Sequence, residues 1–277
     1  MSYTPVVPLS GIAGWRFLQR TETAQKAAFD KSAEVQKDVE YFTQKIGTIK
    51  SAADLVADRR LLKVALGAYG LSDKIDAKAF IRKALEEGTE AEDSFANRLA
   101  DTTYARMAAD FGFGNEAGAQ TAKTGFAAKI TEAYKTNAFQ AAVGEVSDTM
   151  RLAMNFRDQI GALSAGTGKS WYTVLASKPL RAVFEGAYGL PASFVNIDID
   201  KQRDTLAQKT EQLFGTDTLA AFQDADAVTT VMNRFLVTAQ LKEGVSANSR
   251  GAAALTLLQS GSSSGSQGIL NLLTSNG

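Results

Sequence analysis

The amino-acid sequence predicts an all-α protein built from two sequence-related helical subdomains, with flexible N- and C-terminal segments. Three observations favour this fold class. Only four prolines occur in 277 residues, so few positions interrupt a helix. Apolar residues recur three or four positions apart in long runs, as they do on one face of an amphipathic helix. The pentapeptide GAYGL occurs twice, at 67–71 and 186–190, which indicates an internal duplication.

The first subdomain is predicted at residues 14–127, after an extended N-terminal segment at residues 1–13. Two apolar runs predict helices within it, because each run places its side chains on one helical face. These runs comprise Ala28, Val35, Val39, Phe42 and Ile46, and then Ala96, Ala100, Tyr104, Met107 and Phe111.

The second subdomain is predicted at residues 128–241, followed at 242–277 by a C-terminal helix and a tail rich in serine and glycine. Its apolar runs comprise Phe139, Val143, Val146, Met150 and Ala153, and then Val228, Val231, Phe235 and Ala239. Between them, residues 195–200 alternate apolar and polar side chains. We interpret this stretch as an extended lead-in to a helix after Lys201, with a short strand as the alternative.

The similarity between the two subdomains extends beyond GAYGL. LLKVALGAYGLS at 61–72 matches LRAVFEGAYGLP at 180–191, and FTQKIG at 42–47 matches FRDQIG at 156–161. The offset between matched segments grows along the chain, as expected for two copies that differ by loop insertions. The sequence does not determine how the copies pack, and a pseudo-twofold arrangement is our working hypothesis.

Four residues are predicted to terminate helices. Gly70 and Gly189 each follow a helical run and precede a leucine, which is the pattern of a Schellman helix stop. Ser51 stands three residues before an acid, as a serine N-cap does. Ser170 aligns one position after Lys169 as Ser51 follows Lys50, so we expect Ser170 to cap a helix in the same way.

The stretch SAGTGKS at 164–170 resembles the end of a phosphate-binding loop. Such a loop requires a glycine five positions before the Gly-Lys pair and lies between a buried strand and a helix. Here Leu163 occupies the position of that first glycine, and the preceding residues are charged and helically periodic. The first subdomain has no glycine-rich turn at the aligned position. We therefore interpret the stretch as a linker between helices.

The composition excludes several kinds of chemistry. The chain contains no cysteine and no histidine, which removes thiolate nucleophiles, histidine-based acid–base catalysis and the usual zinc ligands. We predict no catalytic, cofactor-binding or metal-binding residue. Lysine plus arginine equals aspartate plus glutamate at 30 each, and no basic cluster occurs, so nucleic-acid binding is not expected.

No stretch is long and apolar enough to span a membrane, and the N-terminus lacks the features of a cleaved signal. The expected location is the cytoplasm, with export that leaves the N-terminus uncut as the open alternative. The oligomeric state is not predicted.

The two ends of the chain contain the candidate partner-binding residues. Trp15, Phe17 and Leu18 either pack the start of a helix onto the core or bind a partner. At the other end, a Ser/Gly-rich linker leads to an apolar pentad containing Ile269, Leu270, Leu272 and Leu273. This pentad either docks on its own domain or inserts into the groove of a neighbour.

Several motifs resemble the alphaproteobacterial family called domain of unknown function 1217. They are PLSGIAGWRFLQRT at 8–21, DLVADRRLLKVALGAYGLSDKI at 54–75, AFIRKALEEGT at 79–89 and FANRLADTTYARMAADFGFG at 95–114. The resemblance is strongest in the first subdomain. It implies no catalytic residue, and it implies a gene context among flagellar genes.

Together these observations predict a non-enzymatic helical interaction or assembly protein associated with the flagellum, in a structural, export or chaperone-like role. A general helical adaptor or small-ligand-binding module is the alternative. An enzyme based on carboxylate or lysine chemistry is the least favoured function.

Overall fold

The computed structural model describes residues 3–99, 101–166 and 170–243, and within these ranges every regular element is a helix. The prediction of an all-α fold is therefore confirmed. The α-helices of the first part of the chain are α1 (Gly11–Asp30), α2 (Ala33–Lys45), α3 (Ala52–Ala57), α4 (Arg59–Ala68), α5 (Lys78–Glu86), α6 (Thr103–Phe111) and α7 (Phe126–Val146). Those that follow are α8 (Asp148–Ala165), α9 (Trp171–Ala176), α10 (Lys178–Ala187), α11 (Ile199–Phe214) and α12 (Ala225–Glu243).

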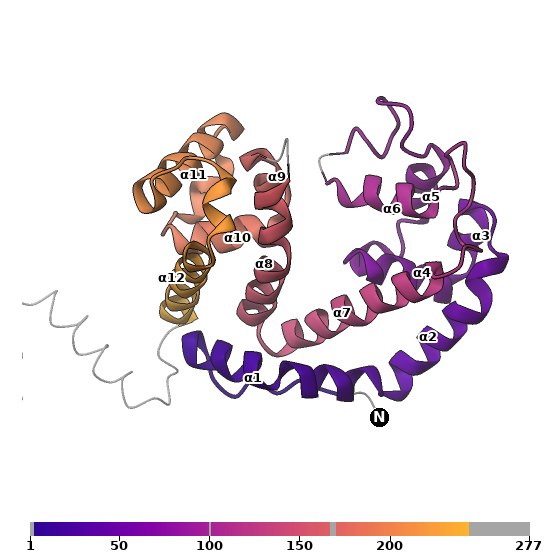
Figure 1. Cartoon of the computed structure of the whole chain (residues 1–277), viewed down its shortest axis with the longest axis horizontal. Coiled ribbons are helices and arrows are strands. Elements are labelled where there is room, and N and C mark those ends of the chain that lie inside the picture. The colour runs from indigo at the N-terminus through magenta and orange to yellow at the C-terminus, as the bar shows by residue number, and fades with distance from the viewer. Residues whose placement is uncertain (1–2, 100, 167–169, 244–277) are drawn as a thin grey trace, which may run out of the picture.

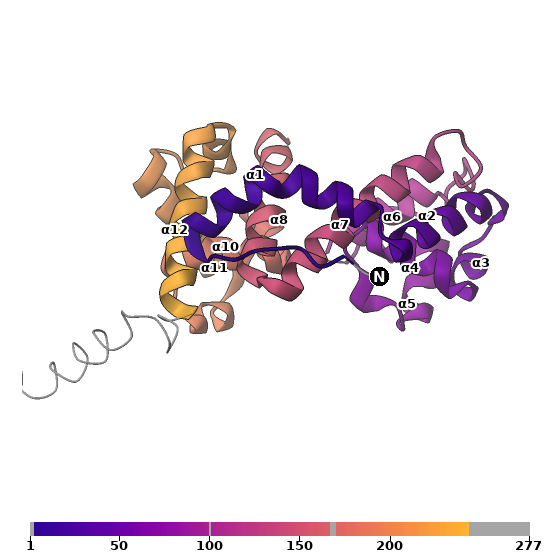
Figure 2. The ribbon, with the colours of Figure 1, turned by 90° about the horizontal axis from the view of Figure 1, so that it is seen from below.

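The helices form two lobes that two long helices connect (Figure 1). In the first lobe, α2, α3 and α7 pack against α4, and α5 packs against α3 and α6. In the second lobe, α8, α9 and α12 pack against α10, and α11 packs against α9. Helices α1 and α7 both run between the lobes, and Figure 2 shows α1 lying across them with the N-terminal segment beside it.

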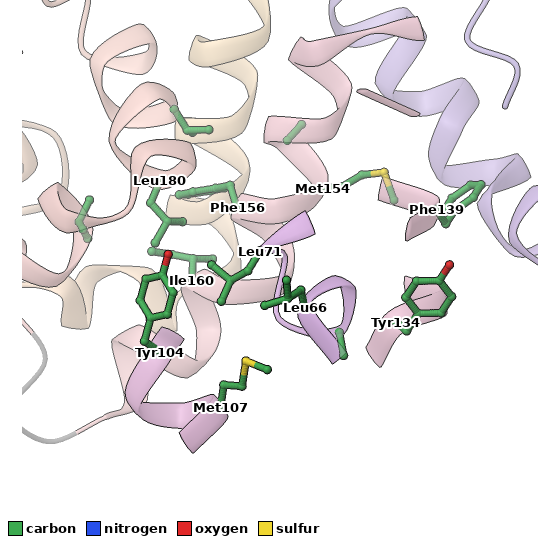
Figure 3. Packing of buried hydrophobic residues seen from close by; sticks show 14 of the residues in the cluster. Leu66, Leu71, Tyr104, Met107, Tyr134, Phe139, Met154, Phe156, Ile160 and Leu180 are labelled. Atoms are coloured by element: carbon green, nitrogen blue, oxygen red, sulfur yellow. The ribbon is translucent and has the colours of Figure 1, made fainter. Parts of the chain in front are cut away.

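The buried hydrophobic side chains form one continuous cluster through both lobes. Figure 3 labels ten of its members, which come from α4, α6, α7, α8, α10 and the turn after α4: Leu66, Leu71, Tyr104, Met107, Tyr134, Phe139, Met154, Phe156, Ile160 and Leu180. The lobes therefore share a core, and burial of this apolar surface is the main force that holds them together.

Glycines at the centres of the two lobes allow close helix contacts. A Cβ atom at Gly67 on α4 would lie 2.6 Å from the ring of Tyr134 on α7. A Cβ atom at Gly186 on α10 would lie 2.8 Å from the ring of Phe235 on α12. Each aromatic ring thus occupies the space that a side chain on the central helix would need.

Both central helices end at a GAYGL segment with the same hydrogen bonds. The amide of Leu71 donates to the carbonyl of Leu66, and the amide of Leu190 donates to the carbonyl of Glu185, at 2.9 and 2.8 Å. Gly70 and Gly189, one residue earlier, have φ angles of 73° and 64°, a region that favours glycine. These are the geometries of Schellman stops.

The same neighbouring helices also bind the last carbonyls of α4 and α10. Asn137 on α7 donates its side-chain amide to the carbonyl of Ala68 at 2.8 Å. Arg234 on α12 donates its Nε to the carbonyl of Ala187 at 2.9 Å. Helix α7 in the first lobe and helix α12 in the second lobe therefore hold the central helix in corresponding ways.

Two apolar runs that the sequence predicts as continuous helices are broken in the structure. Asp30 ends α1, and α2 begins at Ala33 with Ser32 at its N-cap position. The second run is divided at Ser147, whose hydroxyl accepts a hydrogen bond from the amide of Met150 at 3.3 Å. Because the helices on each side of a break bury the same core, the apolar periodicity continues across it.

Two other predicted elements also differ. The helix expected through Ala96 begins only at Thr103, where the Asp101 carboxylate accepts the Thr103 amide, and Ala100 lies outside the described residues. Residues 195–200 form neither a strand nor a wholly extended lead-in. A 3₁₀ turn covers Ala192–Asn196, and α11 starts at Ile199 with Asp198 as its N-cap.

Substitution of Gly67 by alanine tests the contact with Tyr134. Alanine normally stabilises a helix interior by about 0.5–1 kcal/mol relative to glycine. At position 67 the new methyl group overlaps the Tyr134 ring, so we expect Gly67→Ala to lower the free energy of unfolding by about 1–3 kcal/mol. Urea unfolding followed by circular dichroism measures this change.

Gly161 is the matched control, because it lies in α8 and a Cβ atom placed there would meet no neighbouring atom within 4 Å. Gly161→Ala should leave the free energy of unfolding unchanged or raise it by up to about 1 kcal/mol. An equal effect of both substitutions would contradict the close contact.

Candidate functional site

The predicted aromatic anchor at the N-terminus is part of the core. Trp15 is 5 % exposed and Leu18 is fully buried, while Phe17 is half-buried. Arg157 on α8 lies over the Trp15 ring and binds both carboxylate oxygens of Glu22, at 2.6 and 2.8 Å. This arrangement corresponds to the packing alternative for Trp15 and Leu18, since neither side chain offers a surface to a partner.

The segment before α1 lies along that helix in an extended conformation and is held by one side chain. The amide group of Gln25, which is 7 % exposed, accepts a hydrogen bond from the main-chain amide of Val6 at 2.7 Å and donates to its carbonyl at 3.1 Å. Pro5 is buried. The N-terminal segment is therefore fastened to the body of the protein.

Exposed apolar side chains gather where α12 ends and α1 begins. Val237 and Leu241 lie one turn apart on the same side of α12 and are 42 % and 75 % exposed. Leu9, in the segment before α1, is 53 % exposed. The start of α1 abuts this turn, because a Cβ atom at Gly11 would lie 2.1 Å from the side chain of Gln240. We call Val237 and Leu241 the α12 end face.

The sequence contained a signal for the α12 end face that our prediction did not use. Val231 and Phe235 on α12 are buried, as the apolar run predicts. Val237 and Leu241 are apolar too, but they fall on a different side of the helix from Val231 and Phe235. A side of a helix that faces only solvent does not need apolar residues. The predicted partner-binding residues Ile269, Leu270, Leu272 and Leu273 lie outside the described residues.

A cluster of ionisable groups connects α2, α4 and α7, and in it Asp38 and Tyr134 are buried while Lys63 and Glu34 reach the surface. The Asp38 carboxylate accepts a hydrogen bond from the Tyr134 hydroxyl at 2.9 Å and lies 2.7 Å from the Lys63 ammonium group. Lys63 also contacts Glu34 at 3.0 Å. Three helices of the first lobe are thus joined by charge-assisted contacts.

The pKa shifts in this cluster oppose acid–base chemistry near neutral pH. Burial, reinforced by the negative charge of Asp38, raises the pKa of Tyr134 above its ordinary value. Burial alone would lower the pKa of Lys63, but its hydrogen bonds to Asp38 and Glu34 outweigh this effect and raise it. A general acid or base is most effective with a pKa near the working pH, and both groups move away from it.

A surface groove of about 710 Å³ lies beside α3 and is lined by Thr48, Ile49, Asp54, Ala57, Asp58 and Arg59. Its carboxylates have structural partners. Asp58 accepts the Tyr41 hydroxyl at 2.6 Å and the amides of Arg60 and Leu61, so it caps α4. Burial would raise the pKa of Asp58, but these hydrogen bonds outweigh it and hold the pKa below its ordinary value.

The two predicted serine caps differ. Ser51 caps α3, since its hydroxyl oxygen accepts the amide of Asp54 at 3.1 Å and its proton is donated to the Asp54 carboxylate at 2.7 Å. Ser170 stands at the N-cap position of α9, but its side chain makes no capping hydrogen bond, contrary to the prediction. The amide of Thr173 donates to the main-chain carbonyl of Ser170 instead.

The surroundings of SAGTGKS are helical. Helix α8 runs to Ala165 and α9 starts at Trp171, so the stretch does not follow a strand as a phosphate-binding loop does. Among the described residues, no group of three or more aspartate or glutamate side chains is arranged to hold a metal ion. No described helix is long and apolar enough to cross a membrane.

Comparison with known proteins gives a family and a related structure. The family profile described as "Protein of unknown function (DUF1217)" matches residues 68–247, which include both GAYGL segments almost entirely but not the motif at 8–21. No curated protein matches the chain. The crystal structure of protein AGR_C_984 from Agrobacterium tumefaciens is similar, with 27 % sequence identity and a TM-score of 0.70 over 86 % of this chain and 99 % of that one.

Replacement of Tyr134 by phenylalanine tests the structural role of the buried cluster. We expect Tyr134→Phe to lower the free energy of unfolding at pH 7 by about 1–2 kcal/mol, because Asp38 loses one hydrogen-bond donor. Urea unfolding of both proteins at several pH values measures the difference.

The difference in the free energy of unfolding between the wild type and Tyr134→Phe should narrow as the pH rises above about 10, the ordinary pKa of tyrosine. The raised pKa in the folded state means that the unfolded chain releases this proton first, so ionisation favours unfolding of the wild type only. A difference that stays constant up to pH 11 would contradict the buried hydrogen bond.

Proposed function

The chain belongs to the DUF1217 family of proteins of unknown function, and we propose that it is a non-enzymatic interaction or assembly protein associated with the flagellum. The observation that carries this proposal is the α12 end face. One face of α12 is buried in the second lobe, and two apolar side chains, Val237 and Leu241, are exposed near its C-terminal end. Contiguous exposed apolar surface marks sites of protein interaction, and these two side chains are neighbours one turn apart on the helix.

The ionisable groups of the described residues support an interaction role. The most deeply buried carboxylate, Asp38, is engaged by Tyr134 and Lys63, and Asp58 caps a helix. Arg157 joins α8 to α1 through Glu22. Each of these groups joins or ends helices, which makes the frame rigid. A rigid frame suits a protein that holds a docking segment in a defined place.

We further propose that the two lobes are duplicated copies of one helical unit. Helices α3 and α9 both have 6 residues, and α4 and α10 both have 10. Each pair is followed by the same GAYGL stop, and each central helix receives an aromatic ring at a glycine. Helix α7 packs on the first lobe as α12 packs on the second, although α7 lies almost wholly within residues 128–241, the predicted second copy.

In this proposal the apolar pentad at 269–273 is the segment that binds the protein partner. It contains four large apolar residues and follows a Ser/Gly-rich linker, a composition suited to insertion into a groove on a protein partner. The flagellar part of the proposal rests on the gene context that the family resemblance implies. Export to the flagellum without a cleaved signal is compatible with it, and the cytoplasm is the proposed default location.

A small-ligand-binding module is the second candidate function, favoured by the groove beside α3. The groove exposes the charged side chains of Asp54 and Arg59, which could bind a polar ligand. Its carboxylates already have partners within the fold, so this candidate is weaker than partner binding.

Affinity capture from the native cell tests the proposed function. The full-length protein should recover flagellar rod, hook or export components, and a chain ending at Ser260 should not. The double variant Leu270→Ser/Leu273→Ser should lose at least 10-fold in recovery, because burial of a leucine contributes about 1.5–3 kcal/mol. The matched control is Asn271→Ser, which changes a polar residue in the same pentad and should bind normally.

All four proteins retain residues 3–243, so their thermal unfolding should coincide, which separates lost binding from lost folding. Recovery of one non-flagellar partner by every variant would favour an adaptor surface on the lobes instead. If no variant recovers a specific protein, partner binding is contradicted and ligand binding at the α3 groove becomes the leading function.

A further inference from the structure

We propose that residues 252–258 of the same chain fold back onto the α12 end face. This inference rests on the proposed function, since its consequence is to fix the place from which the pentad at 269–273 extends. The occupant is a named segment, AAALTLL, in which six of seven residues are apolar and none is charged. It is the first apolar segment that the chain reaches after α12.

The α12 end face is accessible. Leu241 is 75 % exposed and Val237 is 42 % exposed, whereas Val231 and Phe235, on a different side of α12, are buried in the core. The next turn of the helix ends at Glu243. Two apolar side chains one turn apart form a short stripe, and apolar residues of a second segment can cover such a stripe without any change in the body of the protein.

The length of the connecting chain permits the return. Eight residues, at 244–251, separate the end of α12 from AAALTLL. A flexible chain of this length has an end-to-end distance of about 15 Å, and fully extended it spans about 26–29 Å. Val237 lies six residues before Glu243, which corresponds to about 9 Å along the helix axis. The segment therefore reaches the end face easily.

The same short connection favours this chain over other occupants. A short flexible linker holds its segment at an effective concentration in the millimolar range, well above the concentration at which a second copy or another protein is usually present. The pentad at 269–273 is attached through a longer, Ser/Gly-rich connection, so it competes less well for the end face. Docking of 252–258 leaves the pentad available to a partner.

The absence of cysteine from the chain provides a direct test. In the full-length protein, Val237→Cys is combined with Leu255→Cys, so that the introduced thiols are the only ones present. Val237 is exposed and does not belong to the buried core, and Leu255 follows Glu243 in the sequence, so neither substitution should prevent folding. Circular dichroism verifies that the variant folds. Mild oxidation at micromolar protein concentration is followed by non-reducing electrophoresis and mass spectrometry. A disulfide requires Cβ atoms about 3.5–4.5 Å apart, so it reports contact.

The control pair is Glu92→Cys with Leu255→Cys, because Glu92 is exposed and belongs to the first lobe. We expect an intramolecular disulfide in most molecules of the Val237/Leu255 pair, and at least 10-fold less in the control pair. Leu241→Cys with Leu258→Cys repeats the test at independent positions and replaces the first pair if that variant does not fold.

The other outcomes overturn the inference in distinguishable ways. Disulfide-linked dimers would assign the end face to a second copy of the chain. Equal cross-linking of test and control pairs would show non-specific encounters, and no cross-linking of either test pair would show that AAALTLL does not cover the face. None of these results affects the capture experiment with the chain ending at Ser260, because that chain retains residues 252–258. The capture experiment therefore tests the proposed function independently of the cross-linking experiment.

Discussion

The contact between α4 and α7 is the constraint on which the rest of the structure depends. The absence of a side chain at Gly67 lets the Tyr134 ring lie against α4, and that position brings the Tyr134 hydroxyl to Asp38 on α2. One close approach thus aligns three helices. Because α7 continues from there to α8, the same contact also determines where the second lobe starts. A larger residue at position 67 would displace the helix that joins the lobes.

The local features of the fold could be predicted from the sequence, because they depend on a few adjacent residues. A glycine followed by leucine after an apolar run produces a Schellman stop wherever it occurs, as Gly70 and Gly189 do. Ser51 was predictable as a cap for the same reason, since Asp54 follows at the right spacing. Ser170 shows the limit of this reasoning, because it occupies the N-cap position of α9 while its side chain makes no capping hydrogen bond.

Contacts between distant residues could not be predicted in this way. The helix breaks at Ser32 and Ser147 are hidden in the sequence, since the apolar periodicity on both sides serves one shared core. The burial of Trp15 was open for a related reason. An aromatic residue near a chain end suits a partner as well as it suits a core, and only the position of Arg157 on α8, 142 residues later in the chain, distinguishes the two. Whether such a residue is buried depends on which distant helices pack beside it, and the apolar periodicity of the sequence carries no information on that packing.

The two lobes of the proposed duplication are not equivalent, and this asymmetry accounts for the place of the proposed docking site. In the first lobe, the helix that covers the central glycine is α7, and α8 follows it directly in the chain. In the second lobe, α12 covers Gly186, but no further helix of the described chain follows it, and only the start of α1 abuts its last turns. The apolar residues Val237 and Leu241 therefore stand where the first lobe has a covalent continuation. In the proposed duplication, α12 lacks a following helix within the described chain, and this is the place that we propose residues 252–258 occupy.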